Sequence, residues 1–217
     1  MAGAPLVTVM AKVPRPGAVK TRLVPALGAA AAAALARAMA EDVFTLVAAS
    51  GLPWRVGWAG LADDPWTATL PGTAPPVPQV EGDLGEKLAA ALLGGGIAVG
   101  TDAPTLPLDR LHAAAASPAD LTLVPAEDGG YALVRVSAEA VRRGVFFGVP
   151  WSRHYTLARQ VDRARALGLT VALLEPWRDV DELPDLLHLR ASLLDLPPSS
   201  APHTRRWFES PHAAALR

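Results

Sequence analysis

Short apolar segments alternate with longer helix-like segments along almost the whole chain, and this alternation constrains the fold more than any other feature. The apolar segments lie at 6–10, 54–59, 97–100, 121–124, 131–136 and 170–174, and the first of them is rich in β-branched residues. Helical patterns stand between most of them, the longest at 29–50 and 152–167. Strands and helices that alternate at this spacing form a mainly parallel sheet with right-handed crossovers. We therefore expect an α/β three-layer sandwich built on a mixed, mainly parallel sheet.

Capping residues mark where several of these helices begin and end. Ser137 and Ser152 precede helical patterns as N-caps, and Gly168 follows one at the position where glycine commonly ends a helix. Thr105 and Asp181 are candidate N-caps for the two helices that follow them, because short polar side chains accept hydrogen bonds from the first free N–H groups of a helix.

The length of 217 residues suits a single α/β domain. The composition changes after residue 196, where a Pro-Pro-Ser-Ser run leads into basic and aromatic residues. We therefore expect one domain at 1–196 and a C-terminal extension at 197–217.

Charge and composition exclude several classes of protein. A net charge of −1 argues against a nucleic-acid partner, since such proteins usually carry a basic face. The chain has no cysteine, which excludes disulfides, thiolate nucleophiles and zinc–sulfur sites. It has neither a basic segment ahead of its first apolar run nor a stretch of 18 apolar residues, so we expect a cytoplasmic protein without a membrane segment. The sequence leaves the oligomeric state open.

The loop after the first strand carries an unusual density of cations and reads KVPRPGAVKTRL from Lys12 onward. In an open parallel sheet, ligands bind beyond the carboxyl ends of the strands. Lys12, Lys20 and Arg22 can surround a di- or triphosphate there, Thr21 adds a hydroxyl, and Gly17 lets the backbone approach a ligand closely. The loop is neither a Walker A motif nor a GxGxxG fingerprint, and a solvated basic loop is the alternative. We interpret it as a nucleotide-phosphate loop.

Acidic residues follow two further strands. Thr101 and Asp102 come directly after the buried strand at 97–100, where a carboxylate is well placed to bind a divalent cation or a ribose. Asp179 and Asp181 lie two residues apart on an extended segment and would face the same side. They could complete a metal site with Asp102, or serve as acids that favour a helix N-terminus.

The segment PAEDGGY stands between two strands and contains Asp128 before a Gly-Gly pair. As a hairpin turn it needs no further function, since Asp-Gly is a common turn. The same residues also suit an acceptor site, with a carboxylate as base and glycines that admit substrate. Two tryptophans near these loops, Trp151 and Trp177, are candidates to stack on a base or a sugar. The acceptor site predicted here comprises Gly129, Gly130, Tyr131 and Trp151.

Five segments at these clusters resemble a known family. They read KVPRPGAVKTRLVPALG, QVEGDLGEKL, VGTDAPTL, PAEDGGYAL and DVDELPDL, occur in the family's order, and span residues 6 to about 190. The sequence is similar to the DUF2064 group, also described as selenodomain-associated or arsenosugar-biosynthesis-type glycosyltransferases. That group belongs to the nucleotide-diphospho-sugar transferase superfamily, which has a Rossmann-like GT-A fold. Ala103 stands where serine is common and Arg135 where a glycine is expected, and the second departure bears on the acceptor pocket.

The resemblance implies a nucleotide site formed by the first loop and by the segment from Gln79 to Lys87. Within this segment, Gly82, Asp83 and Gly85 match the family's GDLG turn. We include Gln79 and these three residues among the nucleotide-binding residues.

The resemblance also implies roles for the acids. Asp102 matches the superfamily's metal- or ribose-binding acid, Asp181 matches the late acid that often shares the metal, and Asp128 matches the acid before Gly-Gly. We predict a transferase with Mg²⁺ or Mn²⁺ at Asp102 and Asp181. It would take a nucleotide-sugar donor and pass the glycosyl group to a small acceptor, with Asp102 and Asp128 as catalytic residues.

Two alternatives remain open. The family's relatives include phospholactate guanylyltransferases and molybdenum-cofactor nucleotidyltransferases. The first alternative is therefore guanylyl or cytidylyl transfer from a nucleoside triphosphate to a small phosphorylated acceptor, with release of pyrophosphate. The second is a nucleotide-binding module without catalytic activity.

Overall fold

The computed structural model describes residues 3–60, 64–67 and 72–216. Within these residues lies a seven-stranded sheet with the order β3-β2-β1-β4-β6-β5-β7. Its strands are β1 (Val7–Lys12), β2 (Trp54–Ala59), β3 (Val77–Pro78), β4 (Gly96–Gly100), β5 (Leu121–Pro125), β6 (Tyr131–Val136) and β7 (Val171–Leu173). Neighbouring strands pair in parallel except at β6, which is antiparallel to both β4 and β5. The expected mixed, mainly parallel sheet is confirmed.

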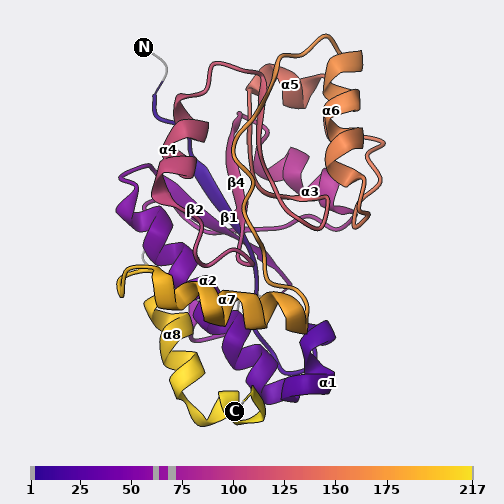
Figure 1. Ribbon diagram of the computed structural model, residues 1–217. Helices are drawn as coiled ribbons and strands as arrows, with labels where there is room; N and C mark the ends of the chain where they lie inside the picture. Colours follow the sequence, from indigo (N-terminus) through magenta and orange to yellow (C-terminus); the bar gives the residue numbers. More distant parts are fainter. Residues whose placement is uncertain (1–2, 61–63, 68–71, 217) are drawn as a thin grey trace.

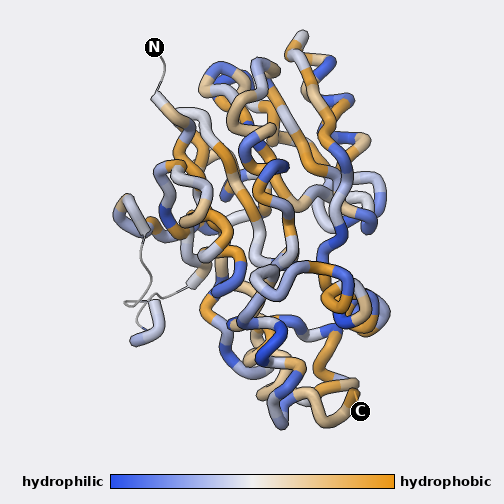
Figure 2. Tube along the Cα trace, turned by 60° about the vertical axis from the view of Figure 1, so that its left-hand side comes forward, coloured by the Kyte–Doolittle hydropathy of each residue, from blue (hydrophilic) through white to orange (hydrophobic). Residues whose placement is uncertain are grey.

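Helices cover both faces of this sheet (Figure 1). One face packs against α2 (Ala29–Ala49) and α4 (Leu108–Ala116), and the other against α3 (Leu84–Ala91), α5 (Ala138–Arg142) and α6 (Thr156–Ala166). Strands covered on both faces are mostly apolar, and Figure 2 shows hydrophobic stretches in the sheet. The three-layer arrangement expected from the sequence is therefore present. No helix in the described part of the chain combines the length and the apolar character that crossing a membrane needs.

The C-terminal helices pack on α2. Helices α7 (Leu183–Asp195) and α8 (Pro202–Glu209) and the 3-10 turn η3 (Pro211–Leu216) form a third core with α2. Trp207 of α8 is 4% exposed, and its indole N–H donates to the carbonyl of Ala31 at 3.2 Å. The buried carboxylate of Asp42 accepts the backbone N–H groups of His203 and Thr204, each at 2.8 Å. This carboxylate thus accepts two of the otherwise free N–H groups in the first turn of α8. The domain boundary at residue 196 stays a prediction.

Ser137 and Gly168 mark helix ends as expected, whereas Ser152 does not. Ser137 caps α5 by accepting the N–H of Ala140 at 3.1 Å, and Gly168 follows α6 with a positive φ of 67°. Ser152 does not cap α6, which begins four residues later at Thr156. The hydroxyl of Thr156 donates to a preceding carbonyl at 2.8 Å and accepts the N–H of Arg153 at 3.1 Å, so it organises the turn in place of Ser152.

Neither Thr105 nor Asp181 caps the helix that follows it. The N-cap of α4 is Pro107, and the hydroxyl of Thr105 instead accepts a hydrogen bond from the Trp177 indole at 3.3 Å. The N-cap of α7 is Glu182, which forms a capping box with Asp185. Asp181 is therefore available for other contacts.

Candidate active site

A pocket of about 360 Å³ lies where β1 and β4 end side by side. We call it the β1–β4 pocket. The parallel pairing brings the first loop and the loop after β4 to the same edge of the sheet, where ligand sites of open α/β sheets are found. The polar side chains that line the pocket are those of Lys12, Lys20, Gln79, Lys87, Thr101, Asp102 and Asp181.

Lys20 occupies the centre of the charged groups in this pocket. Its side chain is 6% exposed, and its Nζ lies 2.6 Å from Asp102 Oδ1 and 3.9 Å from Asp181 Oδ1. The same ammonium donates to the carbonyl of Val180 at 2.5 Å. Lys20 also adopts a left-handed backbone conformation, with φ 45° and ψ 43°, which costs an ordinary residue about 1–2 kcal/mol. The contacts of the ammonium fix its position and offset the cost of this backbone conformation.

The other predicted residues of the first loop divide into two groups. Lys12 lines the pocket, and its Nζ donates to the carbonyl of Ala18 at 2.9 Å, which folds the loop back over the strand end. Gly17, Thr21 and Arg22 are exposed and are not among the residues that line it. Gly17 has a positive φ of 75°, consistent with the tight turn, and Thr21 begins the 3-10 turn η1 (Thr21–Leu23) before α1 (Val24–Leu27).

Arg22 forms an ion pair at the rim of the site. Its Nη1 lies 2.7 Å from Asp181 Oδ2 and 3.4 Å from Glu182 Oε1. Its side chain is 62% exposed, so the pair contributes little stability in water. The guanidinium instead fixes the direction of the Asp181 carboxylate.

The GDLG turn mainly positions α3, and of its four residues only Leu84 lines the pocket. The carboxylate of Asp83 accepts the N–H of Glu86, and the carboxylate of Glu86 accepts the N–H of Asp83, both at 2.9 Å. Gly82 needs its positive φ of 124°. A Cβ at Gly85 would lie 2.6 Å from the carbonyl of Phe146, so the helix approaches that segment closely. The turn thereby points α3 so that Lys87, one turn further on, reaches the pocket.

Gln79 reaches the pocket from the segment after β3. Its amide donates to the carbonyl of Gly57 at 2.8 Å and to that of Ala11 at 3.3 Å. These bonds tie the ends of β1 and β2 together beside the ligand space. Lys87 was not singled out from the sequence as a site residue, although it lies in the segment that the family resemblance implicates.

The predicted acceptor turn is a tight hairpin between β5 and β6. Asp128 Oδ1 accepts the N–H of Gly130 at 2.7 Å. Gly129 has a φ of 88°, and a Cβ there would overlap the carbonyl oxygen of His154. The carbonyl of Gly129 also accepts the N–H of Leu157 at 2.8 Å. The turn is thus packed against the start of α6, and its glycines serve this close approach.

Tyr131 and Trp151 pack against each other beneath this turn. Their rings meet edge to face with centroids 6.4 Å apart, and both pack against the core formed with α3, α5 and α6. Burial raises the pKa of the Tyr131 hydroxyl above its usual range. In the described part of the chain the indole N–H of Trp151 is buried and has no hydrogen-bond partner. Both residues lie under the acceptor turn, and their role in binding an acceptor stays a prediction.

Asp179 interacts electrostatically with Asp128 of the acceptor turn and with Asp102 of the β1–β4 pocket. Burial, followed by the negative charges of Asp128 and Asp102, raises its pKa to about 6, while Lys20 opposes the shift. Perturbed carboxylates in clefts are typical of functional sites. The sequence placed Asp179 only in a late acidic cluster, and its burial beside Asp128 depends on tertiary contacts that periodicity does not reveal. Among the residues that the structure describes, no three His, Asp or Glu side chains are grouped so as to hold a metal ion unaided.

The sheet order and the pocket at the carboxyl ends of β1 and β4 define an α/β protein with a candidate ligand site at that edge of the sheet. Residues 42–153 match the sequence profile of the family described as "uncharacterized protein conserved in bacteria (DUF2064)". The chain belongs to this family, as its motifs indicated. A search of curated proteins found none that matches the sequence.

Solved structures support the fold. A protein of Desulfovibrio desulfuricans G20, provisionally assigned as a nucleotide-diphospho-sugar transferase, is 27% identical with a TM-score of 0.83, covering 100% of this chain and 95% of that one. CMP:2-keto-3-deoxy-manno-octonic acid synthetase complexed with CTP is 11% identical with a TM-score of 0.53, covering 89% of this chain and 99% of that one. HddC of Yersinia pseudotuberculosis is 11% identical with a TM-score of 0.52, covering 87% of this chain and 99% of that one. The last two show the shared fold alone.

Proposed function

We propose that this protein is a nucleotide-dependent transferase that binds the phosphates of a nucleotide-sugar donor in the β1–β4 pocket. One observation carries the proposal. The chain contains three lysines against seventeen arginines, and all three lysines, Lys12, Lys20 and Lys87, line this pocket. A lysine ammonium is a compact point charge, whereas an arginine guanidinium is a broad planar fork. Three compact cations around one small pocket suit the oxygens of a diphosphate.

Lys20 is the residue to which the proposal gives the main electrostatic role. Its ammonium is held at a fixed place by Asp102 and the carbonyl of Val180 before any ligand enters. A preorganised charge needs no rearrangement when negative charge develops on a leaving phosphate, and such stabilisation is often the largest catalytic term. Lys12 and Lys87 would neutralise the remaining phosphate charge.

The carboxylates of Asp102 and Asp181 fit a role as ligands of Mg²⁺ or Mn²⁺. They are 52% and 45% exposed and lie 2.6 and 3.9 Å from the Lys20 ammonium. Nucleotide sites usually hold Mg²⁺ by one or two carboxylates, with substrate phosphates and water as the other ligands. A donor set of two carboxylates therefore fits the ion. When bound, the ion would supply Lewis-acid stabilisation to the leaving phosphate.

Asp128 and Asp179 would act on the acceptor. A carboxylate whose pKa lies near 6 exchanges protons near neutral pH, as a general base requires, and Asp179 has this property. Asp128 is fixed by the N–H of Gly130, so it can orient an acceptor hydroxyl. We assign the positioning role to Asp128 and the proton-accepting role to Asp179. In this scheme the acceptor hydroxyl loses its proton to Asp179 as it attacks the sugar carbon, and the nucleoside diphosphate leaves.

Nucleotidyl transfer is the second candidate. The three lysines provide as much positive charge as a triphosphate requires, and a structure of the same fold was solved in complex with CTP. The two reactions differ in the bond that breaks. A glycosyltransferase releases a nucleoside diphosphate, whereas a nucleotidyltransferase releases pyrophosphate.

Product analysis by ³¹P NMR separates the two reactions. The protein is incubated with Mg²⁺ and either nucleoside diphosphate sugars with neutral hydroxylated acceptors, or nucleoside triphosphates with sugar phosphates. The proposal expects a nucleoside diphosphate from the first mixture that depends on acceptor and is lost in Lys20→Met. Arg142→Met, an exposed substitution on α5, is the matched control and should retain the activity. Pyrophosphate from the second mixture would establish the second candidate, and binding without product in both would leave only a nucleotide-binding module.

A further inference from the structure

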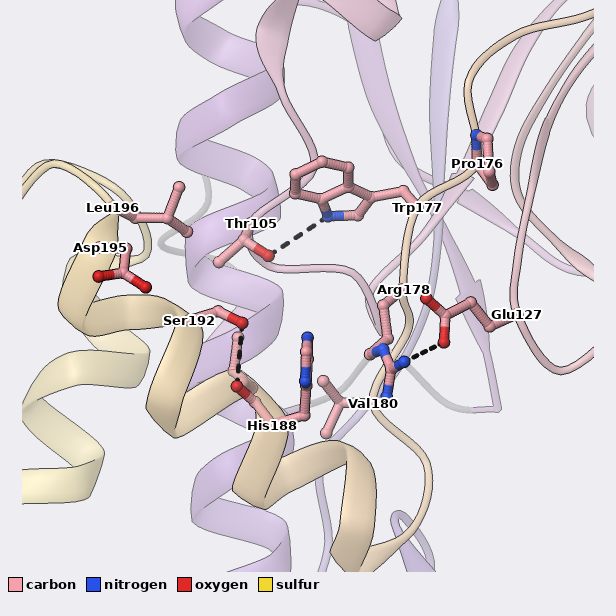
Figure 3. Close-up of a pocket in the computed structure, with 11 residues that line it drawn as sticks. Thr105, Glu127, Pro176, Trp177, Arg178, Val180, His188, Ser192, Asp195 and Leu196 are labelled. Atoms are coloured by element: carbon pink, nitrogen blue, oxygen red, sulfur yellow. Dashed lines mark hydrogen bonds and ion pairs between the residues drawn. The ribbon is translucent and has the colours of Figure 1, made fainter.

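A second cavity, of about 380 Å³, lies between α7 and the extended segment 176–180 that precedes it (Figure 3). We call it the α7 cavity. It shares no lining residue with the β1–β4 pocket. Its volume is within the range of small-molecule sites. The side chains that matter for its chemistry are Glu127, Trp177, Arg178, Val180, His188 and Asp195.

Trp177 forms a fixed, flat wall of this cavity. Its backbone N–H donates to the carbonyl of Pro125 at 2.9 Å, and its indole N–H donates to the hydroxyl of Thr105 at 3.3 Å. The ring is therefore held at both ends, and its only donor is already used. What it offers to a ligand is an apolar ring face, which suits the flat apolar face of another ring.

The charges around the cavity disfavour an anion. Its one guanidinium, that of Arg178, is paired with the carboxylate of Glu127. The carboxylate of Asp195 adds a second negative charge at the other end, on α7. The β1–β4 pocket, with three lysines, has the opposite balance. A phosphorylated or carboxylated ligand would thus be attracted to the β1–β4 pocket and not to the α7 cavity.

The remaining polar groups offer many hydrogen bonds without net positive charge. Figure 3 shows the imidazole of His188 rising from α7 into the space, opposite the Arg178–Glu127 pair. Carboxylates accept, guanidinium donates, and imidazole does either according to its tautomer. We propose that the α7 cavity binds a small uncharged ring compound that carries several hydroxyl groups, such as a sugar or a cyclitol. The ring would stack on Trp177, and its hydroxyls would bond to Asp195, His188 and the Arg178–Glu127 pair.

One wall separates this cavity from the nucleotide site. The side chain of Val180 lines the α7 cavity, while its carbonyl accepts the Lys20 ammonium at 2.5 Å and its N–H donates to the carbonyl of Asp102 at 2.9 Å. The two pockets are thus connected through one residue, Val180. The test therefore uses the protein without nucleotide, so that its result does not depend on the proposed transferase activity.

Ligand-observed saturation-transfer NMR tests the proposal directly. The neutral probes are myo-inositol and the methyl glycosides of neutral hexoses. The charged counterpart is the methyl glycoside of glucuronic acid. We expect transfer to at least one neutral ring and at least tenfold weaker binding in Trp177→Leu and in Asp195→Ala. Asp195 and His188 are exposed on α7, so Asp195→Ala and His188→Ala report on binding even if Trp177→Leu fails to fold.

Leu194→Ala is the matched control, because Leu194 is on the same helix, is 84% exposed and does not line the cavity. It should bind the neutral ring as the unmodified protein does. The proposal is overturned if no neutral ring shows transfer, or if transfer is the same in all three cavity variants. It is also overturned if the glucuronide binds more tightly than the neutral glycoside and loses that binding in Asp195→Ala.

Discussion

Asp179→Asn should stabilise the protein at neutral pH, although it removes a charged residue from the candidate site. The folded protein raises the pKa of Asp179 from its ordinary value of 3.8 to about 6, chiefly by burial. Below pH 3.8 the carboxyl is protonated in both the folded and the unfolded chain, so its pKa shift does not lower the free energy of unfolding. Between about pH 4 and 6 it ionises in the unfolded chain first, and the free energy of unfolding falls as pH rises. Above pH 6 the full cost remains.

The size of this cost follows from the shift. A rise from 3.8 to about 6 is about two pKa units, which corresponds to about 3 kcal/mol at ~1.4 kcal/mol per unit. Asparagine has nearly the same shape and no charge, so Asp179→Asn should recover up to that amount at pH 7 and none of it below pH 4. Urea denaturation at pH 3.5, 5 and 7, within the range where the protein stays folded, measures the difference.

Asp162→Asn is the control for this experiment, because the Asp162 side chain is 62% exposed on α6. It should change the free energy of unfolding by less than ~0.5 kcal/mol at every pH. A loss of stability in Asp179→Asn at pH 7, or an equal gain at pH 3.5 and pH 7, would refute the reasoning. If Asp179 accepts the acceptor's proton, the more stable variant should also turn over more slowly, while nucleotide affinity is maintained.

Three further predictions concern separate parts of the structure. Lys20→Met should weaken nucleotide binding about 10- to 100-fold, the scale of one charge-assisted contact, and Lys20→Arg should not restore it in calorimetric titrations, because the 6% exposed site has no room for a fork. Gly129→Ala should abolish turnover but keep nucleotide affinity, since its Cβ would overlap the His154 carbonyl and displace the acceptor turn; unchanged turnover would contradict this. Trp207→Ala should lower the free energy of unfolding by about 3–5 kcal/mol without changing nucleotide affinity, and a small effect in urea denaturation would show that the extension does not belong to the folded core.

The layers of the fold follow from local sequence patterns. Apolar segments predicted the strands, and β2 and β6 have the bounds expected from the sequence. Cap positions were less predictable, because a hydroxyl or carboxylate can be used elsewhere. Thr105 accepts the indole of Trp177, a partner 72 residues away, instead of capping α4. Such choices depend on tertiary neighbours that a local pattern does not contain.

In the candidate site, too, some residues could be predicted from local sequence and others depend on tertiary contacts. Lys12, Lys20 and Asp102 were predicted from their positions after β1 and β4, and the structure brings all three to one pocket. Asp83 was assigned to the nucleotide by resemblance, and its carboxylate caps α3. The burial of Asp179 arises from residues far apart in the chain, so the sequence alone could not identify it.

The α7 cavity was even less accessible to sequence reasoning. Its wall combines Thr105, Glu127 and the segment 176–180 with one side of α7, and no single motif contains these positions together. The sequence marked Trp177 as a candidate for stacking. Only the hydrogen bond from its indole to Thr105 shows that the ring is fixed and that its face is what remains for a ligand.

Lysine footprinting tests the central claim most directly. Every lysine of the chain lines the β1–β4 pocket. All lysine side chains that an amine-reactive acylating reagent modifies, as detected by mass spectrometry, therefore lie in that pocket. We predict that a nucleoside diphosphate sugar with Mg²⁺ slows the modification of Lys12 and Lys87 together, whereas the corresponding nucleoside without phosphates does not. Equal modification rates with and without the nucleotide, under conditions where binding is established by calorimetry, would contradict the assignment of this pocket.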